Sequence, residues 1–298
     1  MLTESAKDFF EGEKRTMAIQ RLAVIGAGTM GRGIAETAAV KGLSVDLIDS
    51  HLPQHAVALK QITGSLEKGI QRGKLAIASP SEVLDRISWH TDLKAAAGAD
   101  FVVEAVSEQQ AIKMAVLTTL DQVCRPEIIL ASNTSSISIT RLAALTKRPE
   151  KFVGMHFFNP VPIMQPVEIV RGVKTSDETV GATAELAKQM GKEALVVQDA
   201  PGFVVNRVLM PMINEAVYAL QEGVAEPAAI DRLMKLGCNH PMGPLELADL
   251  IGLDVCLSIM RVLHDELGDS KYRPCPLLVR MVDAGKLGRK SGEGFYSY

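Results

Sequence analysis

The chain has few cysteines, and their spacing excludes two common kinds of cysteine chemistry. Its four cysteines, Cys124, Cys238, Cys256 and Cys275, lie far apart and form no CxxC pair. Such spacing is typical of neither a disulfide framework nor a zinc site, and it favours a reducing compartment. We therefore expect no bound metal and a cytoplasmic protein.

Long apolar runs and a strong net charge are also missing. The longest segment without Asp, Glu, Lys or Arg, residues 152–167, contains three prolines, a histidine and an asparagine, so we expect no membrane helix. The net charge of −3 over 298 residues gives no electrostatic reason to expect a nucleic acid or a membrane as a partner. Residues 1–20 mix acids and bases without an apolar centre, so we expect an extension there, not a targeting signal.

A glycine-rich motif follows the first predicted strand. Residues 22–25 are apolar, residues 26–31 read Gly-Ala-Gly-Thr-Met-Gly, and an alanine-rich helix is predicted over residues 32–40. Gly26 permits the tight turn, Gly28 lets the backbone approach a pyrophosphate, and Gly31 lets the helix pack against the strand. Between a strand and a helix, this motif predicts a dinucleotide-binding domain.

An acid at the end of the next strand indicates which dinucleotide is bound. The strand predicted over residues 44–48 is followed by Asp49, about 20 residues after the glycines. A carboxylate there would bind the ribose 2′-hydroxyl of NAD and repel the 2′-phosphate of NADP. NAD is therefore the expected cofactor, and the alternative is that Asp49 only caps the following helix.

Two short apolar runs, residues 155–158 and 167–170, flank a proline-rich bend and are predicted to lie side by side as strands. Alternation places His156 and Glu168 on the opposite face from their immediate apolar neighbours. A buried carboxylate needs a partner, and an imidazole is a natural one. Such a pair would act as a general base, since the carboxylate fixes the tautomer while the other ring nitrogen accepts a proton. The alternative is a core histidine satisfied by a neighbouring acid.

Three other polar features each have two interpretations. Ser135, in the hydroxyl-rich segment after the strand predicted at residues 128–131, would bond a substrate oxygen or cap the next helix. Asn206 would donate to a carbonyl or alkoxide, or satisfy backbone groups at a domain junction. In a predicted helical pair between residues 52 and 86, one face would hold a phosphorylated ligand or be solvated; it comprises Ser65, Lys68 and Arg72.

The pattern of elements predicts two domains. A last strand over residues 194–197 is followed by Asp-Ala-Pro-Gly at 199–202, and helices are then predicted over residues 203–222, 227–236, 245–267 (broken near Gly252) and 276–284. The fold class is α/β: a Rossmann-type doubly wound, mostly parallel sheet with a helical insertion, followed by a smaller all-α domain. The predicted boundaries are residues 1–20 for the extension, 21–200 for the NAD-binding domain and 201–298 for the helical domain.

Taken together, five motifs resemble the L-3-hydroxyacyl-CoA dehydrogenase family, most closely its bacterial 3-hydroxybutyryl-CoA dehydrogenases. The resemblance covers residues 21–298, and the motifs are Gly-Ala-Gly-Thr-Met-Gly (26–31), Ser-Asn-Thr-Ser-Ser (132–136), His-Phe-Phe-Asn-Pro (156–160), Pro-Gly-Phe-Val-Val-Asn-Arg (201–207) and Gly-Arg-Lys (288–290). It implies an NAD-dependent, homodimeric enzyme that interconverts (S)-3-hydroxyacyl-CoA and 3-oxoacyl-CoA, with short chains expected.

The resemblance also implies a role for individual residues. The catalytic pair would be His156 and Glu168, with Ser135 and Asn206 bonding the reacting oxygen. The acyl-CoA thioester would be held by Ser65, Lys68 and Arg72. NAD would be contacted by Gly26, Gly28, Thr29, Met30, Gly31, Asp49, Glu108, Lys113, Ser135, Asn159 and Lys290.

The chain departs from the family pattern at three places. Gln165-Pro166 replaces the Lys-Leu or Ala-Leu usual before the catalytic acid, Gln109 replaces a common asparagine, and residues 1–20 are additional. The first change concerns acyl-chain preference and the second the cofactor pocket. Three alternative functions remain: a 3-hydroxyadipyl-CoA dehydrogenase, a dehydrogenase of small free hydroxy acids, and a non-catalytic NAD-binding protein.

Overall fold

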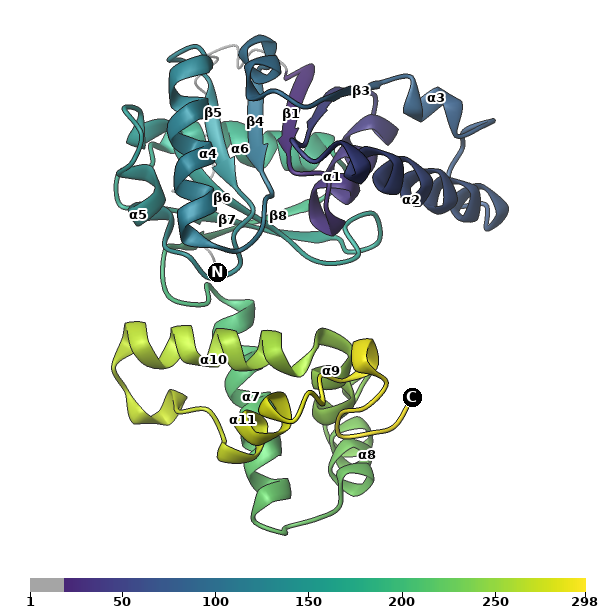
Figure 1. The fold of residues 1–298 in the computed structure, drawn as a ribbon, viewed down its shortest axis with the longest axis vertical. Helices are drawn as coiled ribbons and strands as arrows, with labels where there is room; N and C mark the ends of the chain where they lie inside the picture. The colour runs from purple at the N-terminus through teal and green to yellow at the C-terminus, as the bar shows by residue number, and fades with distance from the viewer. Residues whose placement is uncertain (1–18) are drawn as a thin grey trace, which may run out of the picture. The chain divides into compact units, whose positions relative to one another are not determined.

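The computed structural model describes residues 19–298 (Figure 1), so the predicted N-terminal extension lies almost entirely outside the described residues. The described chain contains one eight-stranded sheet in the order β3-β2-β1-β4-β5-β6-β7-β8. Its strands are β1 (Arg21–Ile25), β2 (Ser44–Ile48), β3 (Ile87–His90), β4 (Phe101–Glu104), β5 (Ile129–Ser132), β6 (Phe152–Phe157), β7 (Pro166–Arg171) and β8 (Glu193–Gln198).

Helices connect and follow these strands. Within the sheet-forming part they are α1 (Thr29–Val40), α2 (Leu52–Gln71), α3 (Ser81–Leu84), α4 (Gln110–Val123), α5 (Ile139–Ala143) and α6 (Asp177–Gln189). After the sheet come α7 (Val205–Gln221), α8 (Pro227–Gly237), α9 (Pro244–Ile251), α10 (Leu253–Leu267) and α11 (Pro276–Asp283). Within residues 19–298, every helix is too short or too polar to cross a membrane.

The sheet aligns the ends of its parallel strands at one edge. Strand β1 pairs in parallel with β2 and β4, and the parallel pairing continues to β3 on one side and to β5 and β6 on the other. In this register Ile25 lies beside Ile48 and Glu104, and Glu104 lies beside Ser132. The segments after β1, β2, β4 and β5 therefore begin at the same level, which confirms the predicted Rossmann-type fold.

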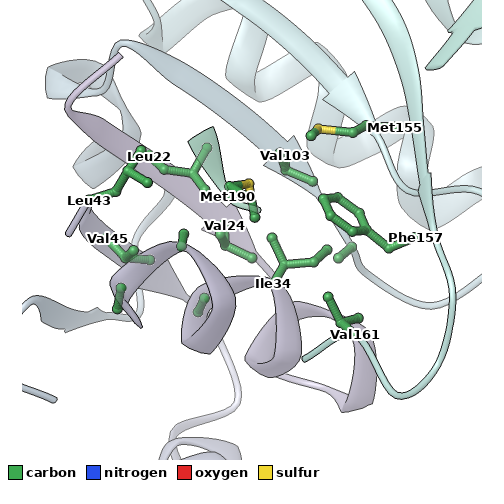
Figure 2. Close-up of a cluster of buried hydrophobic side chains, with 14 of the residues drawn as sticks. Leu22, Val24, Ile34, Leu43, Val45, Val103, Met155, Phe157, Val161 and Met190 are labelled. Carbon is green, nitrogen blue, oxygen red and sulfur yellow. The ribbon is translucent and has the colours of Figure 1, made fainter. Parts of the chain in front are cut away.

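The core fixes helix α1 against the sheet. Figure 2 shows Ile34 of α1 among Val24 of β1, Val103 of β4 and Phe157 of β6, and all four side chains are buried. Met155 belongs to the same cluster. Because side chains alternate along a strand, this packing directs His156 to the opposite face of β6, as predicted.

The chain divides into two compact units. The second comprises residues 196–298 together with residues 134–144 and 170–174. It has its own apolar core, formed by α7 to α11, with Val217, Leu257 and Met260 buried in it. The domain boundary predicted at residue 200 stays a prediction.

Two predictions about helices are confirmed. The helix predicted over residues 245–267 is interrupted as expected, since Gly252 has a φ of +105° between α9 and α10. The helical pair predicted between residues 52 and 86 is present as the long α2 and the short α3. Helix α2 ends before Gly73, whose φ is +64°, and α3 is only 4 residues long. Residues 87–90, for which no strand was predicted, pair with β2 in the sheet.

Candidate functional site

The turn between β1 and α1 requires glycine at two positions and leaves a third open. A Cβ on Gly26 would lie 2.8 Å from the carbonyl oxygen of Ala105, and one on Gly31 would lie 1.7 Å from the carbonyl oxygen of Gly26. At Gly28, by contrast, a Cβ would meet no heavy atom within 4 Å. Gly26 and Gly31 are therefore required for close packing of the backbone. Gly28 is left exposed to a ligand.

A cleft of about 410 Å³ lies over this turn and is lined by Gly26, Gly28 and Asp49. Gly28 is the N-cap of α1, and in the described structure no side chain caps this helix and no acid lies in its first turn. The positive end of the helix dipole is thus left for an anionic ligand. These features fit the pyrophosphate of a dinucleotide.

Asp49 has a structural role and retains capacity for a ligand. Its Oδ2 accepts from the backbone N–H of Ala27 at 2.8 Å, and its Oδ1 accepts from that of His51 at 2.9 Å. These bonds tie the glycine loop to the start of α2, for which His51 is the N-cap. A carboxylate offers about four lone-pair positions, so two remain for ribose hydroxyls. The capping role and the predicted ribose contact are therefore compatible.

A buried carboxylate at the end of β4 holds the next loop of this cleft. Glu104 is fully buried and accepts from Lys113 Nζ at 2.8 Å, from Ser132 Oγ at 2.6 Å and from the N–H of Val106 at 2.8 Å. Lys113 also lies 3.2 Å from Glu108. Two residues expected to contact NAD thus belong to one ion-pair network, centred on an acid for which the sequence analysis gave no role.

The structure brings His156 and Glu168 together. Their contact joins His156 Nδ1 and Glu168 Oε2 at 2.7 Å, and the two residues are only 7% and 2% exposed. Strands β6 and β7 are neighbours in the sheet, which places the two side chains side by side. Because a carboxylate only accepts, Nδ1 carries the hydrogen, and in the neutral ring Nε2 has the lone pair.

A buried amide supports the strand that carries this histidine. The side-chain Oδ1 of Asn133 accepts from the backbone N–H of Phe157 at 2.9 Å. The backbone N–H of Asn133 donates to the carbonyl of Glu104 at 2.8 Å. The sequence analysis noted Asn133 only as part of a hydroxyl-rich segment. Its position directly after a buried strand was the available signal.

Ser135 and Asn206 meet within the second unit. Asn206 Nδ2 donates to the backbone carbonyl of Ser135 at 3.1 Å. Helix α5 is capped by Ser138, whose Oγ accepts from the N–H of Arg141 at 3.2 Å. The capping role considered for Ser135 is thus taken by Ser138, and the backbone role considered for Asn206 is observed.

The predicted basic face lines a second cleft, of about 450 Å³. Lys68 and Arg72 lie there with Lys41, Lys74 and Lys192. Ser65 belongs to the same cleft, and its Oγ donates to Glu36 Oε1 at 2.6 Å. This face therefore borders a cavity rich in positive charge, which suits a phosphorylated ligand.

Three predicted cofactor residues lie elsewhere. Thr29 and Asn159 line an adjoining cleft of about 540 Å³. Lys290 lies in the second unit, where its Nζ donates to Asp254 Oδ2 at 2.6 Å. Their contacts with NAD stay predictions.

Comparison with known proteins identifies the class to which this fold and site belong. The family model for the NAD-binding domain of 3-hydroxyacyl-CoA dehydrogenase matches residues 21–200, and that for the C-terminal domain of the same enzyme matches residues 202–298. The chain belongs to the 3-hydroxyacyl-CoA dehydrogenase family. It is an oxidoreductase, and its cofactor is NAD.

Individual relatives are similar over nearly the whole chain. A probable 3-hydroxybutyryl-CoA dehydrogenase of Bacillus subtilis is 55% identical over 95% of this chain and 98% of its own. The crystal structure of (S)-3-hydroxybutyryl-CoA dehydrogenase from Ralstonia eutropha matches with a TM-score of 0.92 and 49% identity, over 94% and 99% of the two chains. A 3-hydroxyadipyl-CoA dehydrogenase of Escherichia coli is 43% identical over 94% of this chain and 59% of its own.

Proposed function

We propose that the protein interconverts (S)-3-hydroxybutyryl-CoA and acetoacetyl-CoA, with His156 as the general base and acid. The observation that carries this proposal is the buried 2.7 Å contact between His156 and Glu168 in an NAD-dependent 3-hydroxyacyl-CoA dehydrogenase. The names of the similar Bacillus and Ralstonia enzymes support the four-carbon substrate.

The geometry of the pair determines which atom accepts and returns the proton. Bound NAD supplies the hydride acceptor or donor. In oxidation, His156 Nε2 takes the proton of the substrate 3-hydroxyl, and Glu168, held at Nδ1, stabilises the imidazolium. Both side chains are buried, so water screens this attraction little. In reduction, the imidazolium returns the proton to the 3-oxygen.

We propose that Ser135 and Asn206 stabilise the negative charge that develops on that oxygen. A hydroxyl and an amide are suitable donors, and one such donor typically contributes about 10²-fold to turnover. The contact between Asn206 and the Ser135 carbonyl supports the assignment because it ties the two residues together.

The remaining roles follow the family resemblance and the two clefts. We propose that Ser65, Lys68 and Arg72 bind the coenzyme A portion of the substrate. NAD is proposed to contact Asp49 and the glycine turn, for which the open space at Gly28 is the support. The other proposed NAD contacts are Glu108, Lys113, Ser135, Asn159 and Lys290.

We also propose that residues 201–298 form a dimerisation domain. Several large apolar side chains of its helices are exposed, which is typical of a protein interface. They include Val208 (67%), Leu233 (67%), Leu236 (74%) and Leu250 (50%).

The test is NADH consumption by the purified protein with acetoacetyl-CoA, compared with 3-oxoadipyl-CoA and with NADPH as the reductant. Fast turnover of acetoacetyl-CoA with NADH alone is expected. Preference for 3-oxoadipyl-CoA would favour the second candidate function, which the similarity to the Escherichia coli enzyme supports. Absence of turnover with every thioester would contradict the proposal.

A further inference from the structure

A buried carboxyl group lies beside the proposed coenzyme A residues. Glu36 of α1 is 5% exposed and accepts a 2.6 Å hydrogen bond from Ser65 of α2, the helix that runs beside α1 (Figure 1). Glu36, Ser65 and Lys68 line both the 450 Å³ cleft and the adjoining 540 Å³ cleft. Any ligand held by Ser65 therefore comes close to Glu36.

The surroundings of Glu36 are positively charged. Of the described residues that line the two clefts, Glu36 is the single carboxyl group. The other charged groups that line them are Arg32, Lys41, Lys60, Lys68, Arg72, Lys74 and Lys192. The Lys192 ammonium donates to the carbonyls of Val161 and Met164, and burial followed by the charge of Lys41 lowers its pKa. Burial raises the pKa of Glu36 to about 7, although the Ser65 hydrogen bond and Arg32 act to lower it. Glu36 thus changes its charge near neutral pH.

The state of Glu36 decides where the Ser65 hydrogen points. A serine hydroxyl has one hydrogen, and an ionised carboxylate only accepts. When Glu36 is ionised, the 2.6 Å contact uses that hydrogen. A protonated Glu36 has a hydrogen of its own that it can donate to Ser65 Oγ, and in that arrangement the serine hydrogen is available for an anionic oxygen.

We propose that Glu36 is a proton-controlled positioning residue for the thioester: protonated, it releases the Ser65 hydroxyl to bind an anionic oxygen of coenzyme A, and ionised, it withholds that hydrogen and repels the ligand. The proposal rests on the assignment of Ser65, Lys68 and Arg72 to coenzyme A binding. Its consequence is that affinity for coenzyme A falls as pH rises through neutrality.

The first test is calorimetric binding of free coenzyme A at pH 6 and pH 8 by the full chain and its variants. For the wild type, we expect the dissociation constant to rise roughly tenfold, the loss of one hydrogen bond to a charged group. Glu36→Gln carries a side chain that stays neutral and has N–H donors at every pH, so it should keep tight binding at pH 8. Glu36→Ala removes both the titrating carboxyl group and the acceptor for Ser65, and should lose the pH dependence that Glu36 causes. The control variant is Glu67→Gln. Glu67 is exposed on the same helix as Ser65 and lines neither cleft, so this variant should behave as wild type.

The phosphate of coenzyme A itself titrates in this pH range and affects every variant equally. Comparison with Glu36→Gln therefore separates the effect of Glu36 from that of the phosphate. With acetoacetyl-CoA as substrate, the pH effect should fall on KM, not on kcat. Equal pH dependence in wild type and Glu36→Gln, no pH dependence in wild type, or no binding of coenzyme A would overturn the inference. If the pH difference in binding is present while no thioester is turned over, the proposed function fails and the role of Glu36 stands.

Discussion

At the scale of residues, this protein buries several charged groups and compensates most of them with fixed partners. Asp249 accepts from the N–H groups of Phe295 and Tyr296, both at 3.0 Å, and Glu168 is paired with His156. Such partners offset the cost of removing a charge from water. Glu36 is compensated less completely, which is why burial dominates its pKa.

This difference predicts a pH dependence of stability. In the folded state the pKa of Glu36 is about 7, against an ordinary value of 4.5, so the folded protein binds more protons between these pH values. The contribution of Glu36 to the free energy of unfolding therefore falls as pH rises from about 4.5 to 7, by about 3 kcal/mol at most, and is constant above. Glu36→Gln should lack this fall. In urea unfolding, its stability relative to wild type should rise by about 2 to 3 kcal/mol from pH 5 to pH 8; a constant difference would refute the assignment.

Sequence patterns located some of these residues and missed others. The contact of His156 with Glu168 was predictable because alternation and the cost of a lone carboxylate act over a few residues. Glu104 and Glu36 could not be assigned, because their partners Lys113 and Ser65 lie on other helices. A partner brought close only by tertiary packing leaves no local pattern.

At the scale of elements, the β1–α1 turn contains two glycines with different roles: Gly31 is needed for packing, and Gly28 is proposed to contact the cofactor. A methyl group on Gly31 would collide with the carbonyl of Gly26, whereas one on Gly28 meets open space. Both are helix-associated glycines in the same motif, so each serves as the control for the other.

We expect Gly31→Ala to unfold more easily, by at least about 1 to 3 kcal/mol, because the backbone must move to accept the side chain. Gly28→Ala should keep the wild-type melting temperature and bind NADH more weakly, since its methyl group occupies the space for the pyrophosphate. Thermal unfolding and NADH fluorescence titration check both variants. Unchanged NADH affinity in both variants, or equal destabilisation of both, would contradict this division of roles.

Elements with a strong periodic pattern were predictable and short ones were not. The break at Gly252 and the strand at residues 101–104 were found from sequence. Strand β3 was missed because its four residues are stabilised by pairing with β2. Helix α6 was missed although Ser176 caps it and two acids occupy its first turn, a local signal that was available.

At the scale of the whole molecule, exposed apolar side chains of the helical unit are the basis of the proposed association with a second copy. Leu233 and Leu236 of α8 lie three residues apart, and both are largely exposed. An apolar pair of this kind is costly in water, and burial in the proposed dimer would remove that cost.

Light scattering on the purified protein should therefore give twice the chain mass of 32.1 kDa. The double variant Leu233→Glu/Leu236→Glu should shift the protein toward the monomer. As a control, Leu52→Glu/Leu59→Glu changes exposed leucines of α2 and should leave the mass unchanged. A wild-type protein of single-chain mass at micromolar concentration would refute the dimer.

The most direct measurement of the central claim is the turnover of His156→Ala with saturating NADH and acetoacetyl-CoA, with the NADH dissociation constant determined in parallel. Positioned acid and base catalysis contributes about 10²- to 10⁴-fold, so kcat should fall by about that factor while NADH binds as in the wild type. A kcat close to that of the wild type would show that His156 is only a buried partner of Glu168 and would end its assignment as the catalytic base.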